Sequence, residues 1–369
     1  MKNIILLFLV IFTLIPNVTN AGLPDPDNGT FEAKIIEILD ERELKQENGD
    51  ISIQQNLELK ALNGWWTGDE FIYQGISDIE VLNMANTRFE VGDKVLVNRT
   101  KDIEGNVQFY ILNYVRRGYL YLLGLIFAIT VIIVGKKKGF RSLISLAVSF
   151  LIITKFIIPQ ILNGGNPLII SLIGSTLILG LIIYITDGFN KKTHLALISV
   201  ALSLFLTFII SLIFVNLTKL TGFASEEAAF LVGTANIIDF RGLLLAGILI
   251  GTLGVLDDVI VGQVEAVNQI KKLNPNLKTK EVIKAANEIG RTHLGAIINT
   301  LFLTYAGASL PLLILFSLDT SAVSWLQGLD NELITTEIVR TLTGSIGLAL
   351  AFPITTIITA YFLKIKDLK

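Results

Sequence analysis

The sequence predicts a membrane α-helical bundle of seven spans, preceded by an N-terminal signal peptide or signal anchor and a small extracytoplasmic β-barrel domain. The composition favours this fold class, because 52% of the 369 residues are hydrophobic and only 17% are charged, against roughly 25% charged residues in a soluble domain. Seven long apolar runs follow residue 117. Basic residues concentrate in alternate connections between these runs, as they do in membrane proteins.

The first segment, residues 1–21, has the layout of a secretory signal peptide. Lys2 precedes an apolar run over 4–15, Pro16 ends that run, and Ala21 completes a cleavage site of small residues. An uncleaved signal anchor is the alternative, although about twelve apolar residues are fewer than the ~20 that cross a bilayer. Both interpretations export the segment that follows.

Residues 23–115 form a predicted soluble domain rich in β-strands. Runs of β-branched and aromatic residues alternate with Gly, Asn and Asp, which is typical of short antiparallel strands in an OB-like barrel. Trp65, Trp66 and Phe71 form either a ligand-stacking face or part of the barrel core, and the core is favoured. We expect five strands, at 31–39, 51–62, 70–74, 94–98 and 107–115.

The remaining domain, residues 118–369, contains the predicted spans. Lys and Arg residues gather in the connections at 136–141, 191–192 and 271–291 and in the C-terminal tail, whereas the other connections are neutral or acidic. The positive-inside rule therefore places the C-terminus in the cytoplasm and the β domain outside the cell membrane. The apolar runs lie at 118–134, 141–158, 168–186, 195–216, 242–264, 294–316 and 338–363.

Several polar or charged residues near these runs are explained by their position in a helix. Thr279 is a candidate cap for a helix over 280–290 with one apolar face, so we expect this helix to lie along the inner membrane surface. Lys155 and Arg340 lie near outer helix ends, where long side chains extend to the polar interface.

Asp257 and Asp258 are adjacent in the fifth apolar run, roughly 22 Å along the helix from Gly242. A carboxylate at the centre of a membrane helix costs about 2.5–3.5 kcal/mol, so a pair of them indicates a functional role or a partner. At about 100° per residue, Asp258 shares one helix face with Glu265 and four glycines. Such glycines let a neighbouring helix approach closely; they are Gly247, Gly251, Gly254 and Gly262.

This arrangement predicts a proton or ion relay through Asp257, Asp258 and Glu265, leading from the membrane interior to the inner surface. A structural alternative stays open, in which the aspartates lie close to the interface and pair with Arg291 or His293. The following span supplies three polar side chains as supporting contacts, namely Asn299, Thr300 and Thr304.

The stretch Gly254-Val-Leu-Asp-Asp-Val-Ile-Val, with Glu265 and the segment 279–286, resembles the fourth transmembrane helix and following loop of resistance–nodulation–division (RND) exporters. This likeness covers about residues 240–316 and implies that Asp257 and Asp258 relay protons. Over roughly residues 90–365 the chain is more similar to the YibE/F-like family of bacterial multi-pass membrane proteins, which implies no established activity. The chain departs from RND exporters in its extra spans before the acidic helix and in its small exported domain.

The sequence therefore predicts a membrane transporter or exporter, coupled to protons or other ions and working among membrane lipids as a homo-oligomer such as a dimer. Its β domain would engage an extracytoplasmic protein or small molecule. The alternative is a membrane-anchored assembly or accessory protein whose exported β domain binds a partner. We expect no enzymatic activity, because adjacent aspartates on one helix point about 100° apart and cannot share a proton as an aspartyl protease dyad does.

No cofactor, metal site or nucleic-acid partner is expected. The chain has no cysteine and only two histidines, His194 and His293, so a structural zinc site of Cys and His ligands is excluded. It contains no nucleotide-binding loop motif, and its basic residues flank the spans and form no patch.

Overall fold

The computed structural model describes residues 29–45, 51–76, 88–102, 105–224, 228, 230–231, 239–318 and 328–363. The predicted signal peptide or anchor, residues 1–21, lies outside these ranges. The described chain divides into two compact units, one that extends to residue 130 and one that begins at residue 131. The two units are described separately.

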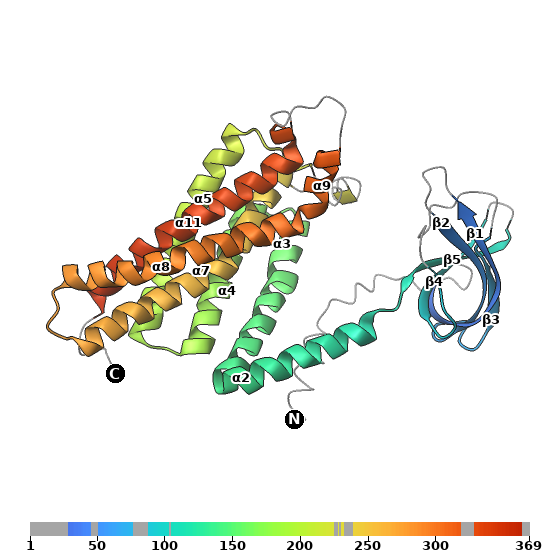
Figure 1. The fold of residues 1–369 in the computed structure, drawn as a ribbon, viewed down its shortest axis with the longest axis horizontal. Coiled ribbons are helices and arrows are strands. Elements are labelled where there is room, and N and C mark those ends of the chain that lie inside the picture. The colour runs from blue at the N-terminus through green and yellow to red at the C-terminus, as the bar shows by residue number, and fades with distance from the viewer. Residues whose placement is uncertain are drawn as a thin grey trace. The chain divides into compact units, whose positions relative to one another are not determined.

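The first unit contains a five-stranded antiparallel sheet (Figure 1). Strand β1 (Gly29–Lys45) is central and pairs with β2 (Ile51–Ala61) on one side and β4 (Lys94–Lys101) on the other. The outer strands are β3 (Glu70–Gln74), which pairs with β2, and β5 (Val107–Tyr114), which pairs with β4. All five predicted strands are confirmed, and β1 is considerably longer than expected.

The prediction of a closed barrel is wrong, because β3 and β5 form no ladder with each other in the described sheet. Their side chains do meet, since the rings of Phe71 and Phe109 stack with centroids 4.4 Å apart. Register shifts in β1 follow Ile35 and Ile38, and such bulges bend a strand and increase its twist. The sheet therefore bends around its core without joining its two edges by hydrogen bonds.

The core of the sheet comes from alternate residues of the three central strands. Trp66 and Phe71 pack against this core, which confirms the core interpretation for these two residues. Trp65, in contrast, is 67% exposed and takes no part in the core. The fully buried aliphatic residues at the centre are Ile35, Leu57, Leu59, Val95 and Val97.

Within the described residues, five helices are long and apolar enough to cross a membrane, which fits a membrane protein. The first is a continuous helical run over Arg117–Leu162 that includes both predicted spans at 118–134 and 141–158. It comprises α2 (Arg117–Ile152), a π-helical turn η1 (Ile153–Ile157) and α3 (Ile158–Leu162).

Helix α2 is kinked at Lys136, whose φ of 50° and ψ of −128° are not helical. The chain turns sharply there, and Gly139 packs directly against the backbone carbonyl of Val131. A side chain at position 139 would collide with that carbonyl. The kink therefore lies between the two predicted spans, and the count of seven spans stays a prediction.

The other four apolar helices agree with the predicted runs at 168–186, 195–216, 242–264 and 338–363. Asparagine side chains accept hydrogen bonds from backbone N–H groups at the starts of three of them, as expected of good N-cap residues. The helices are α4 (Pro167–Asp187), α5 (Lys191–Leu217), α7 (Phe240–Leu273) and α11 (Glu332–Phe362).

The predicted surface helix over 280–290 is instead the first part of a 30-residue helix, α8 (Thr279–Ala308), which forms a hairpin with α7 (Figure 1). Its apolar face is not left for the membrane surface, because Val282 and Ala286 pack against side chains of α7 and α11. The predicted run at 294–316 is divided, since α8 ends at Ala308 and a separate helix, α9 (Leu310–Leu318), follows.

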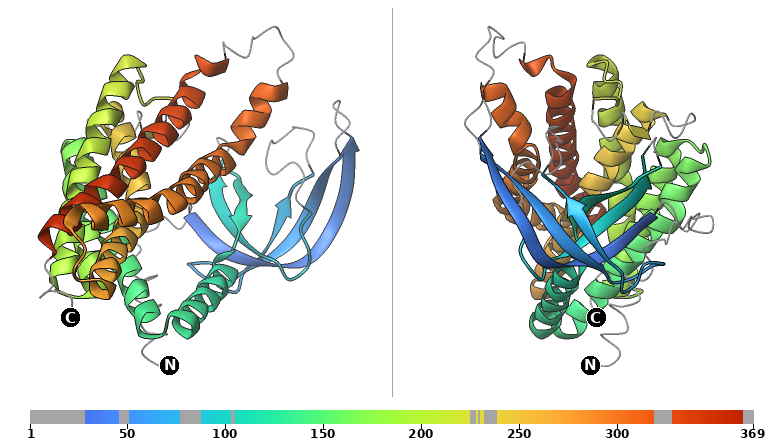
Figure 2. Two further views of the ribbon diagram at one scale, coloured as in Figure 1. Left: turned by 60° about the vertical axis from the view of Figure 1, so that its left-hand side comes forward. Right: turned by 90° about the vertical axis from the view of Figure 1, so that its right-hand side faces the viewer.

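Helices α5 and α11 lie side by side (Figures 1 and 2) and meet through small residues. Gly347 of α11 touches Thr207 of α5 so closely that an added Cβ would lie 2.9 Å from the Thr207 Cβ. Small residues let helix backbones approach in this way, and packing then holds the helices together. The contact face of α5 carries a small polar residue at every fourth position, all fully buried: Ser199, Ser203, Thr207 and Ser211.

A buried amide joins three helices near the end of the bundle that contains the α7–α8 connection. The Gln263 Nε2 atom of α7 donates hydrogen bonds of 2.7 Å to the Ala286 carbonyl of α8 and to the Thr356 hydroxyl of α11. Gln263 is only 3% exposed, and buried polar groups are stable only when they are hydrogen-bonded.

Candidate functional site

Asp257 and Asp258 occupy the middle of α7 but differ in their surroundings. Asp258 is exposed, whereas Asp257 is half-buried, because adjacent residues of a helix point about 100° apart. The Oδ1 atom of Asp257 is shielded from solvent and has no hydrogen-bond partner among the residues that the structure describes. Asp258 and Asp187, the last residue of α4, are the charges that act on Asp257.

Neither aspartate forms an ion pair within the described ranges. The two partners considered in the structural alternative, Arg291 and His293, are both exposed. Asp187 itself is paired with Lys138, at 3.7 Å. The side chain of Asp257 is therefore a half-buried carboxyl group with two like charges and no described cation beside it.

Glu265, the third predicted relay residue, is held by several donors. It accepts hydrogen bonds from Lys192 Nζ at 2.9 Å, from Gln269 Nε2 at 2.6 Å and from Asn268 Nδ2 at 3.1 Å. The contact with Lys192 ties the second half of α7 to the start of α5. Glu265 thus has the environment of a stabilised anion.

The glycine face of α7 is open in the described chain. All four predicted packing glycines are exposed, and a Cβ added at Gly247, Gly254 or Gly262 would meet nothing within 4 Å. Gly251 differs, because the hydroxyl group of Tyr305 from α8 lies against it. The close helix approach expected along this face is therefore found at Gly251 and not at the other three positions.

The predicted supporting residues lie on the exposed face of α8. Asn299, Thr300 and Thr304 are all exposed. The Thr300 hydroxyl donates to the Ala296 carbonyl at 2.9 Å, and the Thr304 hydroxyl donates to the Thr300 carbonyl at 2.7 Å. Both hydroxyl groups are thus bonded to their own helix, and the described hydrogen bonds do not connect them to the aspartates.

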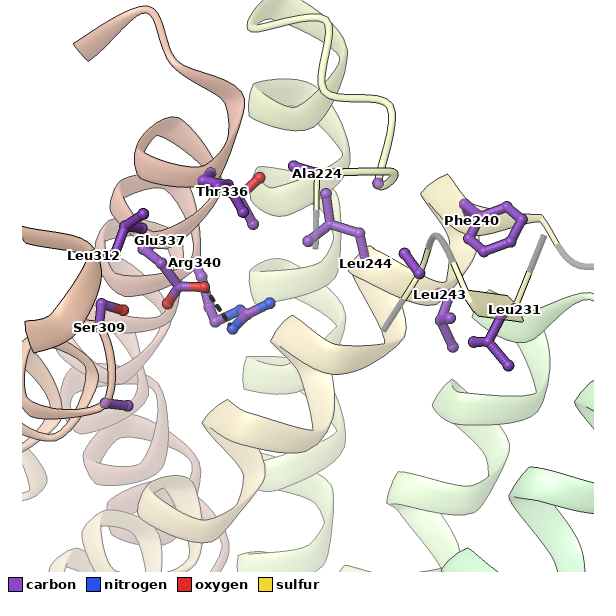
Figure 3. Close-up of a pocket in the computed structure, with 14 residues that line it drawn as sticks. Ala224, Leu231, Phe240, Leu243, Leu244, Ser309, Leu312, Thr336, Glu337 and Arg340 are labelled. Carbon is purple, nitrogen blue, oxygen red and sulfur yellow. Dashed lines mark hydrogen bonds and ion pairs between the residues drawn. The ribbon is translucent and has the colours of Figure 1, made fainter. Parts of the chain in front are cut away.

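A cavity of about 570 Å³ lies at the opposite end of α7, where this helix begins (Figure 3). It is bordered by the first turns of α7 and α11 and by the junction of α8 with α9, together with Gly222, Ala224, Ala228 and Leu231. We call it the Arg340 cavity. Its lining residues include Phe240, Leu243, Leu244, Ser309, Leu312, Thr336, Glu337 and Arg340.

The polar wall of the Arg340 cavity comes from α11. Arg340 Nη1 donates to Glu337 Oε1 at 2.8 Å, and each side chain is about a quarter exposed, at 27% and 25%. Arg340 Nε and the Thr336 hydroxyl are buried and have no hydrogen-bond partner in the described part of the chain. Sequence reasoning missed this site because it assigned Arg340 to the membrane interface. The signal was Glu337, three residues earlier on the same helix face.

Tyr305 stands between the Arg340 cavity and the glycine face. Arg340 and Glu337 both act on it electrostatically, while its hydroxyl group contacts Gly251. Six to seven residues of α7 separate Gly251 from the aspartates, which corresponds to about 10 Å at 1.5 Å per residue.

The described residues contain no group of three His, Cys, Asp or Glu side chains that could hold a metal ion.

The fold and these sites define a membrane protein that combines a helical bundle with a small β-sheet unit. Residues 123–365 match the sequence profile of the YibE/F-like family, described as "YibE/F-like protein". The match covers well over half of the chain, so the protein belongs to the YibE/F-like family. No curated protein and no solved structure matches it.

Proposed function

We propose that this protein is a membrane transporter coupled to protons or other ions through Asp257 and Asp258. The observation that carries the proposal is the Asp257 side chain. It lies on a helix long and apolar enough to cross a membrane, and its buried Oδ1 has no hydrogen-bond partner among the described residues. A carboxylate in such a place is costly when charged, so it is suited to bind and release a proton or cation as its surroundings change.

The other polar groups of α7 extend this proposal to a path. The path begins at Tyr305 beside Gly251, continues along the exposed face to Asp258, and ends at Glu265, which Lys192 holds. Glu265 would then be the exit site on the cytoplasmic side.

The orientation and span count form part of the same proposal. The basic connections lie in the cytoplasm together with the C-terminus, and the β unit lies outside as an open, OB-like sheet. Seven spans result if the kink at Lys136 separates two spans and α8 with α9 forms another. The strand order β3-β2-β1-β4-β5 suits an OB-like sheet, since that fold is a partly open five-stranded barrel.

A homo-oligomer, in the simplest case a dimer, follows from the exposed polar groups. Asp258, Asn299 and Thr300 are exposed in a single chain, and polar groups are rarely left facing lipid. A second copy packed over the bare glycines of α7 would remove these groups from lipid.

The test is proton flux in vesicles reconstituted with the full-length protein, measured with a trapped pH-sensitive dye after an imposed pH gradient. Asp257→Asn and Asp258→Asn each remove a titratable group with little change in shape. We expect at least a tenfold loss of flux in each variant. Asp239→Asn is the matched control, because Asp239 is an exposed carboxylate just before α7, and it should keep the wild-type flux. Wild-type flux in both test variants would refute the proposal.

A second candidate function is favoured by the surface of the β unit. Trp65 is 67% exposed and Ile72 is 54% exposed, and exposed aromatic residues are frequent anchors of protein interfaces. In that case the chain is an assembly or accessory protein whose helices serve as an anchor. Deletion of residues 23–115 would then abolish function, while Asp258→Asn would have no effect.

A further inference from the structure

We infer that the Arg340 cavity binds a small amphipathic molecule that carries an anionic head, a carboxylate or a phosphate, on a short apolar tail. The inference rests on the proposed function only for the role of this ligand as cargo. Binding itself can be measured without any transport.

The size and lining of the cavity fit such a ligand. Its volume of about 570 Å³ lies within the range of roughly 300–1,000 Å³ typical of small-molecule sites. Phe240, Leu243, Leu244 and Leu312 supply an apolar lining, while the polar groups gather on the α11 wall (Figure 3). An apolar pocket with a few convergent polar groups is the usual form of a ligand site.

The hydrogen bonding of Arg340 indicates the charge of the head group. Glu337 occupies the Nη1 atom, whereas Nε, on another edge of the guanidinium group, has no described partner. The edge formed by Nε and Nη2 carries two parallel N–H donors, which match the two oxygens of a carboxylate or phosphate. The Thr336 hydroxyl is likewise buried without a partner among the described residues, and Thr336 lines the same cavity. Because both residues line the cavity, a ligand there lies beside two donors that have no described partner.

The Arg340 side chain is largely buried on a helix long and apolar enough to cross a membrane, so its charge is costly to leave without a second partner. It lies about 12 Å along α11 from Glu332, at 1.5 Å per residue, and cations within an apolar layer mark sites of ligand or ion binding. The carboxylate at the start of α11 is already satisfied. Glu332 accepts hydrogen bonds from Thr221 N at 2.6 Å and from Gly222 N at 3.1 Å, so it does not compete for the guanidinium group.

Calorimetric titration of the purified full-length protein in phosphatidylcholine nanodiscs tests the inference, with octanoate and octyl phosphate as probes. We expect saturable binding of both anions, and at least tenfold weaker binding of the neutral analogue octanamide. Arg340→Gln should weaken anion binding at least tenfold, and Arg340→Lys should recover only part of it, because a lysine cannot bind two oxygens side by side. Glu337→Gln should tighten binding, since it removes the competing carboxylate.

Two further variants keep the test decisive. Lys155→Gln is the matched control, because Lys155 is an exposed cation of another apolar helix outside the cavity, and it should bind the anions as the wild type does. Ala308→Phe fills the cavity from the end of α8 without touching Arg340 chemically, and it should also abolish binding, which covers the case that Arg340→Gln does not fold. Equal binding of anions and octanamide, or unchanged binding in both Arg340→Gln and Ala308→Phe, would overturn the inference.

Two additional measurements are needed. The first distinguishes a lipid head group from a free anion as the ligand, and the second distinguishes the cavity proposal from the transport proposal. If nanodiscs with phosphatidylglycerol weaken octanoate binding, the natural ligand is a lipid head group, and if they do not, it is a free organic anion; both results support the site. Asp258→Asn should bind octanoate like the wild type. A wild-type protein that binds octanoate but carries no proton flux would therefore refute proton coupling and leave the cavity assignment standing.

Discussion

Substitution of Gly347 by alanine tests the close packing of α5 against α11. The added Cβ would lie 2.9 Å from the Cβ of Thr207 and 3.0 Å from its Cγ2, with the hydroxyl group closer still. Rotation of the Thr207 side chain cannot relieve the contact with its Cβ, so the two helices must separate by several tenths of an ångström. Forced overpacking costs typically about 1–3 kcal/mol, and the rigid contact here places the cost near the upper value.

Helix propensity acts in the opposite direction and reduces the net effect. Alanine is more favourable than glycine inside a helix by about 1 kcal/mol. The expected net loss of stability for Gly347→Ala is therefore about 2 kcal/mol. In a unit of this size, 1 kcal/mol corresponds to about 2–4 °C, so the thermal midpoint should fall by about 4–8 °C.

Thermal unfolding of the detergent-solubilised protein, followed by circular dichroism, measures this change. Thr207→Ala removes the hydroxyl and methyl groups that crowd position 347, so the double variant should recover part of the loss, with a coupling energy of about 0.5–3 kcal/mol. Gly254→Ala is the control, because a Cβ there meets nothing within 4 Å, and it should be neutral or stabilising. A Gly347→Ala protein at least as stable as the wild type would show that the helices are not in rigid contact.

Three other predictions concern the buried amide, the sheet core and the kink. Gln263→Leu removes two buried hydrogen bonds and should lower the unfolding free energy in denaturant titrations by about 1–3 kcal/mol; an unchanged midpoint would contradict the assigned role. Leu57→Ala empties a fully buried position of the sheet and should cost about 2–5 kcal/mol, whereas Trp65→Ala, at an exposed position, should stay within about 0.5 kcal/mol; equal losses measured by proteolysis of the β unit would refute this core. Lys136→Gly relieves a backbone conformation that L-residues rarely adopt and should raise the thermal midpoint by the equivalent of about 1 kcal/mol; a lower midpoint would argue against the kink.

Local patterns in the sequence predicted the elements whose character depends on their own residues. The five strands and the helices at 168–186, 195–216 and 242–264 were all placed correctly, because period-2 alternation and long apolar runs are local signals. Barrel closure was not predictable in the same way, since it depends on whether two strands distant in sequence meet. Here β3 and β5 meet through the rings of Phe71 and Phe109 and not through a ladder of hydrogen bonds.

The errors in the helical unit have the same cause. The apolar face of the segment 280–290 suits a membrane surface or a protein neighbour equally well, and only the fold shows that α7 and α11 cover it. Arg340 was placed at the polar interface near a helix end, and the sequence did not reveal its cavity, because the cavity depends on the packing of several segments. The aspartates, in contrast, were identified from the energetic cost of placing a carboxylate within an apolar helix, which the local sequence shows. Their different exposures follow from helical geometry alone.

The amide of Gln263 restricts how the bundle can deform. It lies six residues beyond Asp257 on α7 and fastens this helix to both α8 and α11. Because breaking these bonds inside the bundle would leave polar groups unsatisfied, the three helices should respond to a change of charge at Asp257 as one stiff body at this level. A hinge in α7 would then lie away from this level, near Gly247 or Gly254, where an added Cβ meets nothing within 4 Å.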